Sequence, residues 1–269
     1  MPKVQIRRPE TLKAGETAPW YDSGASKSQT YFDRAGEPIH LHIHDVAAGA
    51  VLTVGPVPSA CSIYIWKGAV DAEGATLRAG SSLVVERGRA VALTAGAGGA
   101  TLVAFRDAAP GGADRAGGHL HLLPADDVPR YDKDALTGGS SGGLHANGEC
   151  PSCHVWLHEN HLPGMSDAES RSRSRFGVHS HSEAEVIFIT EGSMRLGTQC
   201  VGPGTAIAIA EDTLYGFTAG PDGLSFINFR ADRPTDVIMA DGSRMDEVGF
   251  WKKMVAEPRY ISPEPATAG

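Results

Sequence analysis

The apolar residues of this chain occur in short runs that are separated by turn-forming residues. The runs are rich in Val, Ile and Leu, and each is bounded by Gly, Pro or a charged residue. This pattern is typical of short β-strands rather than long helices. In the first half of the chain it predicts strands at residues 39–44, 50–54, 62–66, 69–71, 82–85, 90–94 and 100–106. The only predicted helix covers residues 246–256, so the expected fold class is all-β.

A further strand is predicted at residues 177–192, which become wholly apolar after residue 185. Side chains two residues apart point to the same side of a strand. One face of this strand would therefore carry His179, His181, Glu183, Glu185, Ile187 and Ile189. The strand is expected to end at Gly192, a turn-forming residue.

This strand carries a candidate metal site. The imidazoles of His179 and His181 and the carboxylate of Glu185, four residues further on, can converge on one cation. Two His and one carboxylate suit Fe(II) and leave positions open for water, substrate or O₂. The same ligands can also hold Mn, Ni, Co or Zn. We therefore expect a divalent metal at these three residues and favour Fe(II).

The chain also contains an internal repeat. Residues 63–68 match residues 187–192 at an offset of 124. The same offset relates 103–106 to 227–230, Gly80 to Gly204, Gly96 to Gly220 and Pro110 to Pro234. Upstream, residues 42–45 resemble residues 156–159 at an offset of 114, so about ten extra residues are expected at 166–175. Two repeats of short strands predict two tandem jelly-roll barrels.

The spacing His-x-His-x3-Glu-x6-Gly, from His179 to Gly192, resembles the first signature of the cupin superfamily. Together with the repeat, the resemblance implies a two-domain cupin made of double-stranded β-helix barrels. The expected organisation is an N-terminal arm at 1–38, a degenerate barrel at 39–110, a linker at 111–148, a metal-binding barrel at 149–235, and a helix and tail at 236–269.

The first copy has lost the metal motif. Its positions equivalent to His179, His181 and Glu185 are Gly55, Val57 and Cys61. This barrel is therefore expected to be metal-free, with a role in packing or in forming a homodimer. A row of alternating histidines at residues 40–44 is interpreted as the solvated face of an edge strand.

The second copy departs from the cupin pattern at Tyr215, which stands where the second cupin signature has a His. Either Tyr215 is a fourth metal ligand or an acid near the metal, or it is a packing residue. A bound metal lowers the pKa of an acidic group, so a phenolate ligand is physically reasonable. Tyr215 and Glu183 are the candidates for moving a proton in catalysis.

Three residues are candidates for binding substrate. In cupins the strand equivalent to residues 154–159 lines the mouth of the pocket, so the resemblance implies this role for Trp156 and His158. The alternative is a solvent-facing row. Arg175, in the Arg-Ser insertion before the metal strand, could clamp a substrate carboxylate with two hydrogen bonds. The alternative for that insertion is a solvated loop.

The motif Cys150-Pro-Ser-Cys153-His154 has several interpretations. The pattern occurs at c-type haem attachment sites, but haem attachment requires export, and no signal peptide is evident. A zinc site would need two more ligands, to which His145, His154 or His158 could contribute. The favoured interpretation is a turn in which the thiols are incidental.

Charge and composition restrict the partners. The chain has 269 residues, a net charge of −8 and a pI of about 5.7, which argues against nucleic-acid and anionic-membrane partners. No apolar run approaches the length of a membrane span. The four cysteines do not form a disulfide scaffold pattern, and a cytoplasmic location is expected.

Three functions are consistent with these features. The favoured one is an enzyme, a mononuclear iron oxygenase or dioxygenase that acts on a small aromatic or carboxylated substrate. The second is a metal-dependent isomerase or lyase of an enolisable substrate. The third is a non-catalytic protein that binds or senses a small molecule, since one fold can host many functions.

Overall fold

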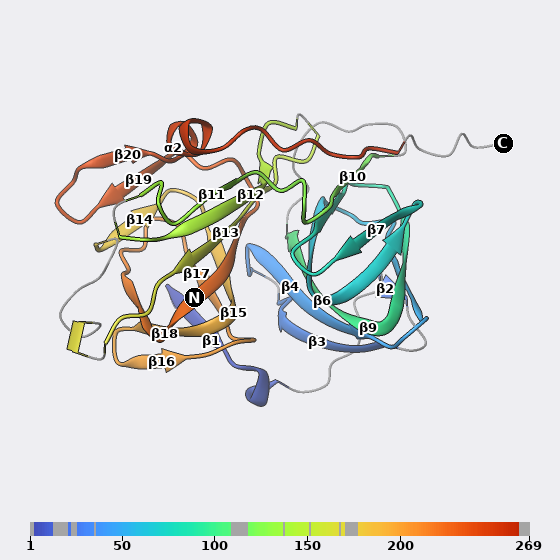
Figure 1. Cartoon of the computed structure of the whole chain (residues 1–269), viewed down its shortest axis with the longest axis horizontal. Coiled ribbons are helices and arrows are strands. Elements are labelled where there is room, and N and C mark those ends of the chain that lie inside the picture. The colour runs from blue at the N-terminus through green and yellow to red at the C-terminus, as the bar shows by residue number, and fades with distance from the viewer. Residues whose placement is uncertain are drawn as a thin grey trace. The chain divides into compact units, whose positions relative to one another are not determined.

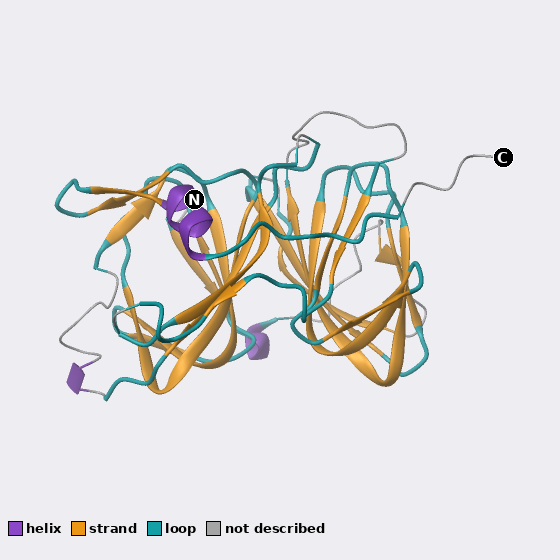
Figure 2. Ribbon diagram, turned by 45° about the horizontal axis from the view of Figure 1, so that its top comes forward, coloured by secondary structure: helices purple, strands orange, loops and turns teal. Residues whose placement is uncertain are grey.

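The computed structural model describes residues 3–12, 21–22, 26–34, 36–108, 118–136, 138–150, 152–166, 168–169 and 177–263. The chain divides into two compact units. Unit 1 contains Met1–Thr11, Pro129–Asn147 and Trp156–Glu257, and unit 2 contains Leu12–Val128, Gly148–Val155 and Pro258–Gly269. Strands dominate both units, which confirms the predicted all-β class (Figure 2).

Unit 2 contains a nine-stranded antiparallel sheet among its described residues. Its main strand order is β10-β8-β6-β9-β4-β3, and β2, β5 and β7 pair beside this path (Figure 1). The strands are β2 (Tyr21–Asp22), β3 (Ser26–Phe32), β4 (Ile39–Val46), β5 (Val51–Val54), β6 (Cys61–Ala72), β7 (Ala75–Arg78), β8 (Ser82–Val85), β9 (Val91–Asp107) and β10 (Leu120–Leu123).

Unit 1 contains an eight-stranded sheet of order β1-β17-β15-β18-β13-β12-β11, with β16 paired to β15, and a three-stranded sheet of order β14-β19-β20. The elements are β1 (Val4–Arg7), η1 (Pro9–Thr11), β11 (Arg130–Tyr131), β12 (Ser141–Asn147), β13 (Trp156–Leu162), β14 (His179–His181), β15 (Glu185–Leu196), β16 (Gln199–Val201), β17 (Ala206–Ile209), β18 (Phe217–Arg230), β19 (Asp236–Met239), β20 (Arg244–Asp246) and α2 (Glu247–Met254). No helix among the described residues is long and apolar enough to cross a membrane.

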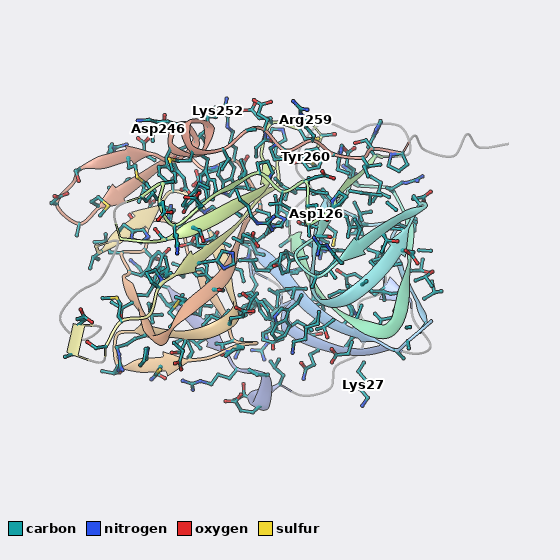
Figure 3. All side chains as sticks on the ribbon, viewed as in Figure 1. Lys27, Asp126, Asp246, Lys252, Arg259 and Tyr260 are labelled. Atoms are coloured by element: carbon teal, nitrogen blue, oxygen red, sulfur yellow. The ribbon has the colours of Figure 1, made fainter. Side chains whose placement is uncertain are left out.

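The predicted helix is confirmed as α2, where Asp246 acts as the N-cap and accepts a hydrogen bond from the N–H of Gly249. Asp246 and Lys252 mark the start and the last turn of this helix (Figure 3). An acceptor at the start and a cation near the end both stabilise a short helix.

The internal repeat is a repeat of strands. β6 and β15 are each 12 residues long, begin 124 residues apart, and hold the same place in their sheets. β6 pairs with β7, β8 and β9, and β15 pairs with β16, β17 and β18. The equivalence of the strands explains why the offset is constant over this part of the chain.

A close backbone approach explains why one glycine recurs. Gly68 and Gly192 have φ angles of 72° and 67°, which favour glycine. A Cβ atom would lie 2.0 Å from the carbonyl oxygen of Gly99 at the first position and 2.1 Å from that of Gly223 at the second. No other residue fits either position without movement of the backbone.

The upstream register of the repeat differs from the prediction. His42 on β4 pairs with Ala104, and His158 on β13 pairs with Asn228, which is the repeat equivalent of Ala104. His42 therefore corresponds to His158 at an offset of 116 rather than 114, and the insertion has eight residues.

The histidine row at residues 40–44 does not lie on a solvated edge. β4 is paired on both sides, with β3 and with β9. His42 and His44 are each 1 % exposed. This interpretation was wrong because residues 26–32, expected to be part of an irregular arm, form β3 and cover the edge.

Two further segments contribute strands to the sheets. The expected arm contributes β1 to unit 1, where it pairs with β17, as well as β2 and β3 to unit 2. The expected linker at 111–148 contains β10, which pairs with β8, and the hairpin strands β11 and β12.

Candidate functional site

The stretch at 177–192 forms two strands rather than one. β14 joins the three-stranded sheet, and β15 begins at Glu185 in the large sheet. Glu183 falls in the intervening bend, where its carboxylate accepts a hydrogen bond of 2.6 Å from the Ser182 hydroxyl. It does not line the pocket described below, so the expected continuous face from residue 179 to 189 is interrupted.

A pocket of about 280 Å³ opens within unit 1. One part of its wall is polar and contains His158, His179, His181, Tyr215, Arg230 and Glu247. The other part includes the aromatic rings of Tyr131, Phe217, Phe226, Phe250 and Trp251. An apolar cavity with a few convergent polar groups is the usual form of a small-molecule site.

Arg230 lies at the centre of the polar wall and is fully buried. Its Nη1 atom donates a hydrogen bond of 2.6 Å to Glu247, and its Nη2 atom lies 3.5 Å from Oε2 of Glu185 and 3.3 Å from Nε2 of His181. Asn228 also donates a hydrogen bond of 2.6 Å to Glu185. A buried guanidinium is stabilised by such charged and hydrogen-bonded partners.

Both carboxylates of this cluster are held ionised. Burial raises the pKa of Glu247, but the charge of Arg230 and a contact with His181 outweigh it and keep this pKa below its ordinary value. Burial likewise raises the pKa of Glu185, and the adjacent His181 ring and the charge of Arg230 bring it below its ordinary value. The cluster therefore carries two negative charges and the positive charge of Arg230.

The two histidines of β14 each place Nδ1 near an acceptor, although only that of His179 forms a hydrogen bond. Nδ1 of His179 lies 3.3 Å from the carbonyl oxygen of Gly177, an obligatory acceptor, so this nitrogen carries the proton. Nδ1 of His181 lies 3.4 Å from Oε2 of Glu247. This arrangement leaves the Nε2 atoms as electron-pair donors, as in metal sites where the other ring nitrogen is held by an acceptor.

The three expected ligands fit a divalent cation in their donor chemistry. Nε2 of His181 lies 3.9 Å from Oε1 of Glu185, which is buried and has no hydrogen-bond partner. Nη2 of Arg230 approaches the same histidine nitrogen, so a cation would share this space with the guanidinium. His179, His181 and Glu185 would hold the ion.

Tyr215 is 7 % exposed and faces His179, to which it is joined by two backbone hydrogen bonds of 2.9 Å. Burial and the charge of the neighbouring Glu185 carboxylate raise the pKa of Tyr215 well above its ordinary value. The phenol therefore keeps its proton at neutral pH, which favours a hydrogen-bond donor over a phenolate.

Trp156 and His158 are buried, which excludes the solvent-facing alternative for their strand. The indole Nε1–H of Trp156 donates a hydrogen bond of 2.9 Å to Nδ1 of His158. Burial lowers the pKa of His158 to about 3, so this ring is neutral. His158 lines the pocket and Trp156 fixes its orientation. Arg175, the third candidate, lies outside the described residues.

Three residues of the site were not predicted from the sequence: Asn228, Arg230 and Glu247. Arg230 and Asn228 pair directly across the sheet from Glu185 and Ile187, and Glu247 is the first residue of α2. One signal was available, since Arg230 repeats the equally buried Arg106 at the constant offset. Glu247 had no signal, because its helix docks on the site only in the folded chain.

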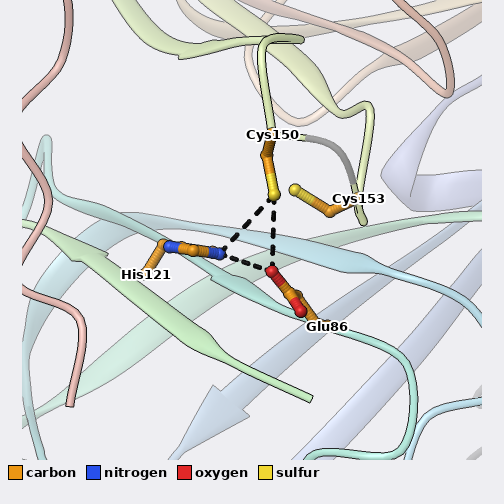
Figure 4. A group of neighbouring side chains, drawn as sticks. All are labelled: Glu86, His121, Cys150 and Cys153. Carbon is orange, nitrogen blue, oxygen red and sulfur yellow. Dashed lines mark hydrogen bonds and ion pairs between the residues drawn. The ribbon is translucent and has the colours of Figure 1, made fainter. Parts of the chain in front are cut away.

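A second group of potential ligands lies in unit 2. Glu86, His121, Cys150 and Cys153 each place one donor atom within 4.8 Å of the others (Figure 4). Among the described residues, this is the group whose donor atoms are close enough to share one ion as they stand. Cys150 and Cys153 thus lie in one group of potential ligands, and His145, His154 and His158 are not part of it.

No protein-family model and no curated protein matches the sequence. Solved structures do match the fold. Protein Ylba from E. coli is 15 % identical with a TM-score of 0.62, and the match covers 85 % of this chain and 90 % of that one. Oxalate decarboxylase from Bacillus subtilis is 12 % identical with a TM-score of 0.59, covering 87 % and 82 %. The 11S globulin from Wrightia tinctoria is 10 % identical with a TM-score of 0.59, covering 88 % and 85 %.

The chain therefore has the cupin fold. These neighbours include an enzyme and a globulin described with an auxin binding site, so the fold leaves the activity open.

Proposed function

We propose that the pocket of unit 1 is the active site of a metal-dependent enzyme, a mononuclear iron oxygenase of the dioxygenase type. The observation that carries this proposal is the orientation of His179 and His181. Each has its Nδ1 atom beside a fixed acceptor, which leaves Nε2 to bind a metal together with the buried carboxylate of Glu185.

The charge of the site supports a divalent ion. Glu185 and Glu247 outweigh Arg230, so these three residues have a net charge of one negative unit. A divalent cation would reverse this sign and make the site attractive to a small carboxylate. Fe(II) suits two imidazoles and one carboxylate, and Mn, Ni, Co or Zn remain alternatives.

The aromatic part of the wall supports a planar substrate. Phe217 and Phe226 pack edge to face with ring centroids 5.5 Å apart, and Trp251 lies 5.1 Å from the ring of His158. Such rings give an aromatic compound a large contact area and exclude water. We propose a small aromatic or carboxylated substrate, with Arg175 as a candidate for clamping its carboxylate.

The chain's own residues would control protons and orientation. Tyr215 keeps a proton on its phenol oxygen and can donate it to a substrate oxygen, while His158 is held neutral by burial. A bound metal would supply Lewis acidity and, as Fe(II), redox chemistry with O₂. The protonated Tyr215 also supports a second candidate, an isomerase or lyase of an enolisable substrate, in which this residue is the acid.

The test is O₂ consumption by the full-length protein loaded with Fe(II) without air, using a panel of small aromatic and keto carboxylic acids. The proposal expects substrate-dependent O₂ uptake that is lost in His179→Ala/His181→Ala. His161→Ala is the matched control, because its side chain is 43 % exposed and outside the pocket. Turnover that needs the metal but no O₂ would favour the lyase. Tight binding without turnover would favour a sensor and refute the enzyme.

A further inference from the structure

Four side chains from three separate stretches of unit 2 converge on a small volume (Figure 4). Glu86 follows β8, His121 lies on β10, and Cys150 and Cys153 lie in the loop between β12 and β13. Pairing of β8 with β10 places the first two side by side, and the backbone N–H of Glu86 bonds the carbonyl of His119. The sheet thus builds half of the group, and the loop brings the other half to it.

The spacing of the donor atoms matches a single small ion. Sγ of Cys150 lies 3.4 Å from Oε1 of Glu86 and 3.9 Å from Nε2 of His121. Nε2 of His121 lies 2.7 Å from the same carboxylate oxygen. Ligands on a tetrahedral zinc ion are separated by about 3.3–3.8 Å, given the usual Zn–N, Zn–O and Zn–S bond lengths. The His121–Glu86 contact would have to expand, and all four donor atoms already lie within 4.8 Å of one another.

We propose that Glu86, His121, Cys150 and Cys153 bind a structural zinc ion. Two thiolates, one imidazole and one carboxylate are ligands that zinc accepts in a closed four-coordinate site. Two sulfur atoms and a carboxylate crowded together are mutually unfavourable as anions, and a divalent cation removes that repulsion.

The surrounding groups orient the ligands for this role. Nδ1 of His121 lies 3.2 Å from the Ser262 hydroxyl, which leaves Nε2 for the metal. Oε2 of Glu86 accepts a hydrogen bond of 3.1 Å from the N–H of His119. Sγ of Cys150 accepts a hydrogen bond from the N–H of Ser152. His121, Glu86 and Cys150 thus each have a neighbour that fixes the orientation of the side chain.

Sγ of Cys153 similarly accepts a hydrogen bond from the N–H of Val155, two residues further on. Two backbone hydrogen bonds close the loop. The N–H of His154 donates to the carbonyl of Cys150 at 3.3 Å, and the N–H of Gly148 donates to the carbonyl of Val155 at 3.0 Å. These backbone hydrogen bonds fix the path of the loop that carries the two sulfur atoms.

The zinc ion would attach the loop at Gly148–Val155 to the β-sheet of unit 2. The loop at Gly148–Val155 belongs to unit 2, although the strands on both sides of it, β12 and β13, belong to unit 1. Near His121, Leu122 and Ile261 exchange two backbone hydrogen bonds, which attach the C-terminal segment to β10. The zinc ion would fix the loop to β10, just as the Leu122–Ile261 hydrogen bonds fix the C-terminal segment to it.

The proposed zinc site is not the degenerate remnant of the cupin site. The position equivalent to Glu86 in the second copy is Ala210, so unit 1 has no counterpart. The positions equivalent to the proposed iron ligands in unit 2 include Val57 and Cys61, which are part of the apolar core of that unit.

The test is metal binding by full-length protein purified with a thiol reductant, then loaded separately with Zn(II) and Co(II) and exchanged into metal-free buffer. The variants are Cys150→Ser/Cys153→Ser and His179→Ala/His181→Ala, with Cys200→Ser as the matched control because Cys200 is exposed. The readouts are zinc per chain and the near-ultraviolet thiolate-to-cobalt charge-transfer band, which only sulfur ligands produce.

The expected result is one tightly held zinc and a thiolate–cobalt band in the wild type, in His179→Ala/His181→Ala and in Cys200→Ser. Cys150→Ser/Cys153→Ser should lose that zinc and the band. Zinc should also protect both thiols of the wild type from alkylation, while Cys200 reacts at once as an internal control. Absence of the band in the wild type would overturn the proposal, and so would a Cys150–Cys153 disulfide in its place. These wild-type measurements decide the question even if the double serine variant does not fold.

Discussion

Nη1 of Arg230 lies 2.6 Å from Oε2 of Glu247, and this ion pair joins the last residue of β18 to the first residue of α2. The Arg230 and Glu247 side chains are 1 % and 7 % exposed, so neither charged group is solvated by bulk water. The short helix therefore docks on the sheet through a buried charge as well as through Trp251, which packs in the adjacent apolar cluster.

The first prediction concerns this ion pair. Glu247→Gln keeps the shape of the side chain but leaves Arg230 with less compensation, and we expect a loss of about 3–5 kcal/mol in the free energy of unfolding. Urea unfolding followed by circular dichroism measures it. The control is Asp236→Asn, whose partner Arg244 is 65 % exposed, and it should change stability by less than about 1 kcal/mol. Equal effects of the two substitutions would contradict the assignment.

Tyr215 is predicted to act through its phenol proton rather than as a metal ligand. Tyr215→Phe should keep the ring packing and the metal content of the protein, but lower turnover by about 10²-fold or more, because the proton donor is removed. Metal analysis and steady-state rates on the same sample separate the two roles. Loss of the metal along with turnover would show that the phenol oxygen is a ligand.

Two glycines of the β15–β16 hairpin, Gly192 and Gly197, are predicted to differ in how much their substitution by alanine lowers stability. Gly192 has no room for a Cβ atom, while at Gly197, with a φ of 58°, no atom lies within 4 Å of one. Gly197→Ala should cost about 1 kcal/mol for the left-handed backbone alone. Gly192→Ala should cost about 2–5 kcal/mol, because it adds a clash with the backbone. Denaturant midpoints compare them directly.

His44 predicts a dependence of stability on pH. Burial lowers its pKa to about 3, whereas the unfolded chain has a value near 6.5, so the unfolded state binds more protons between these values. Stability should therefore fall as the pH drops below about 6.5, by up to about 1.4 kcal/mol per pH unit from this residue.

His44→Phe should reduce that slope. Ser28→Ala is the control, because it removes the hydrogen bond of 2.8 Å to His44 but keeps the buried imidazole. Unfolding curves at pH 7, 6 and 5 measure both. An unchanged slope in His44→Phe would mean that other groups dominate acid unfolding.

Much of the fold follows from local patterns. Short apolar runs bounded by turn residues predicted strands of unit 2, and the repeat of Gly68 as Gly192 predicted the equivalence of β6 and β15. The helix predicted at residues 246–256 is α2. These features depend on residues close in the chain, and the backbone conformation of a strand or a turn constrains them directly. The burial of His42 was predicted wrongly, because alternation shows which residues share a face but not what covers it.

The sequence alone predicted only part of the candidate site. His179, His181 and Glu185 form a short motif, so the sequence alone identified them as potential ligands, and it determined that the first copy lacks this motif. Tertiary structure decided which groups surround them. Arg230 reaches the site because β18 pairs with β15, and Glu247 because α2 packs over the pocket.

The same division holds for the cysteine motif. The sequence determined the spacing of Cys150 and Cys153, but two sulfur atoms do not specify a site. Glu86 and His121 are 35 residues apart in sequence and meet only because β8 pairs with β10, and a loop far downstream then reaches them. Strand periodicity is a local property of the chain, whereas a cluster of charged and metal-binding groups depends on long-range packing, so only the folded structure reveals it.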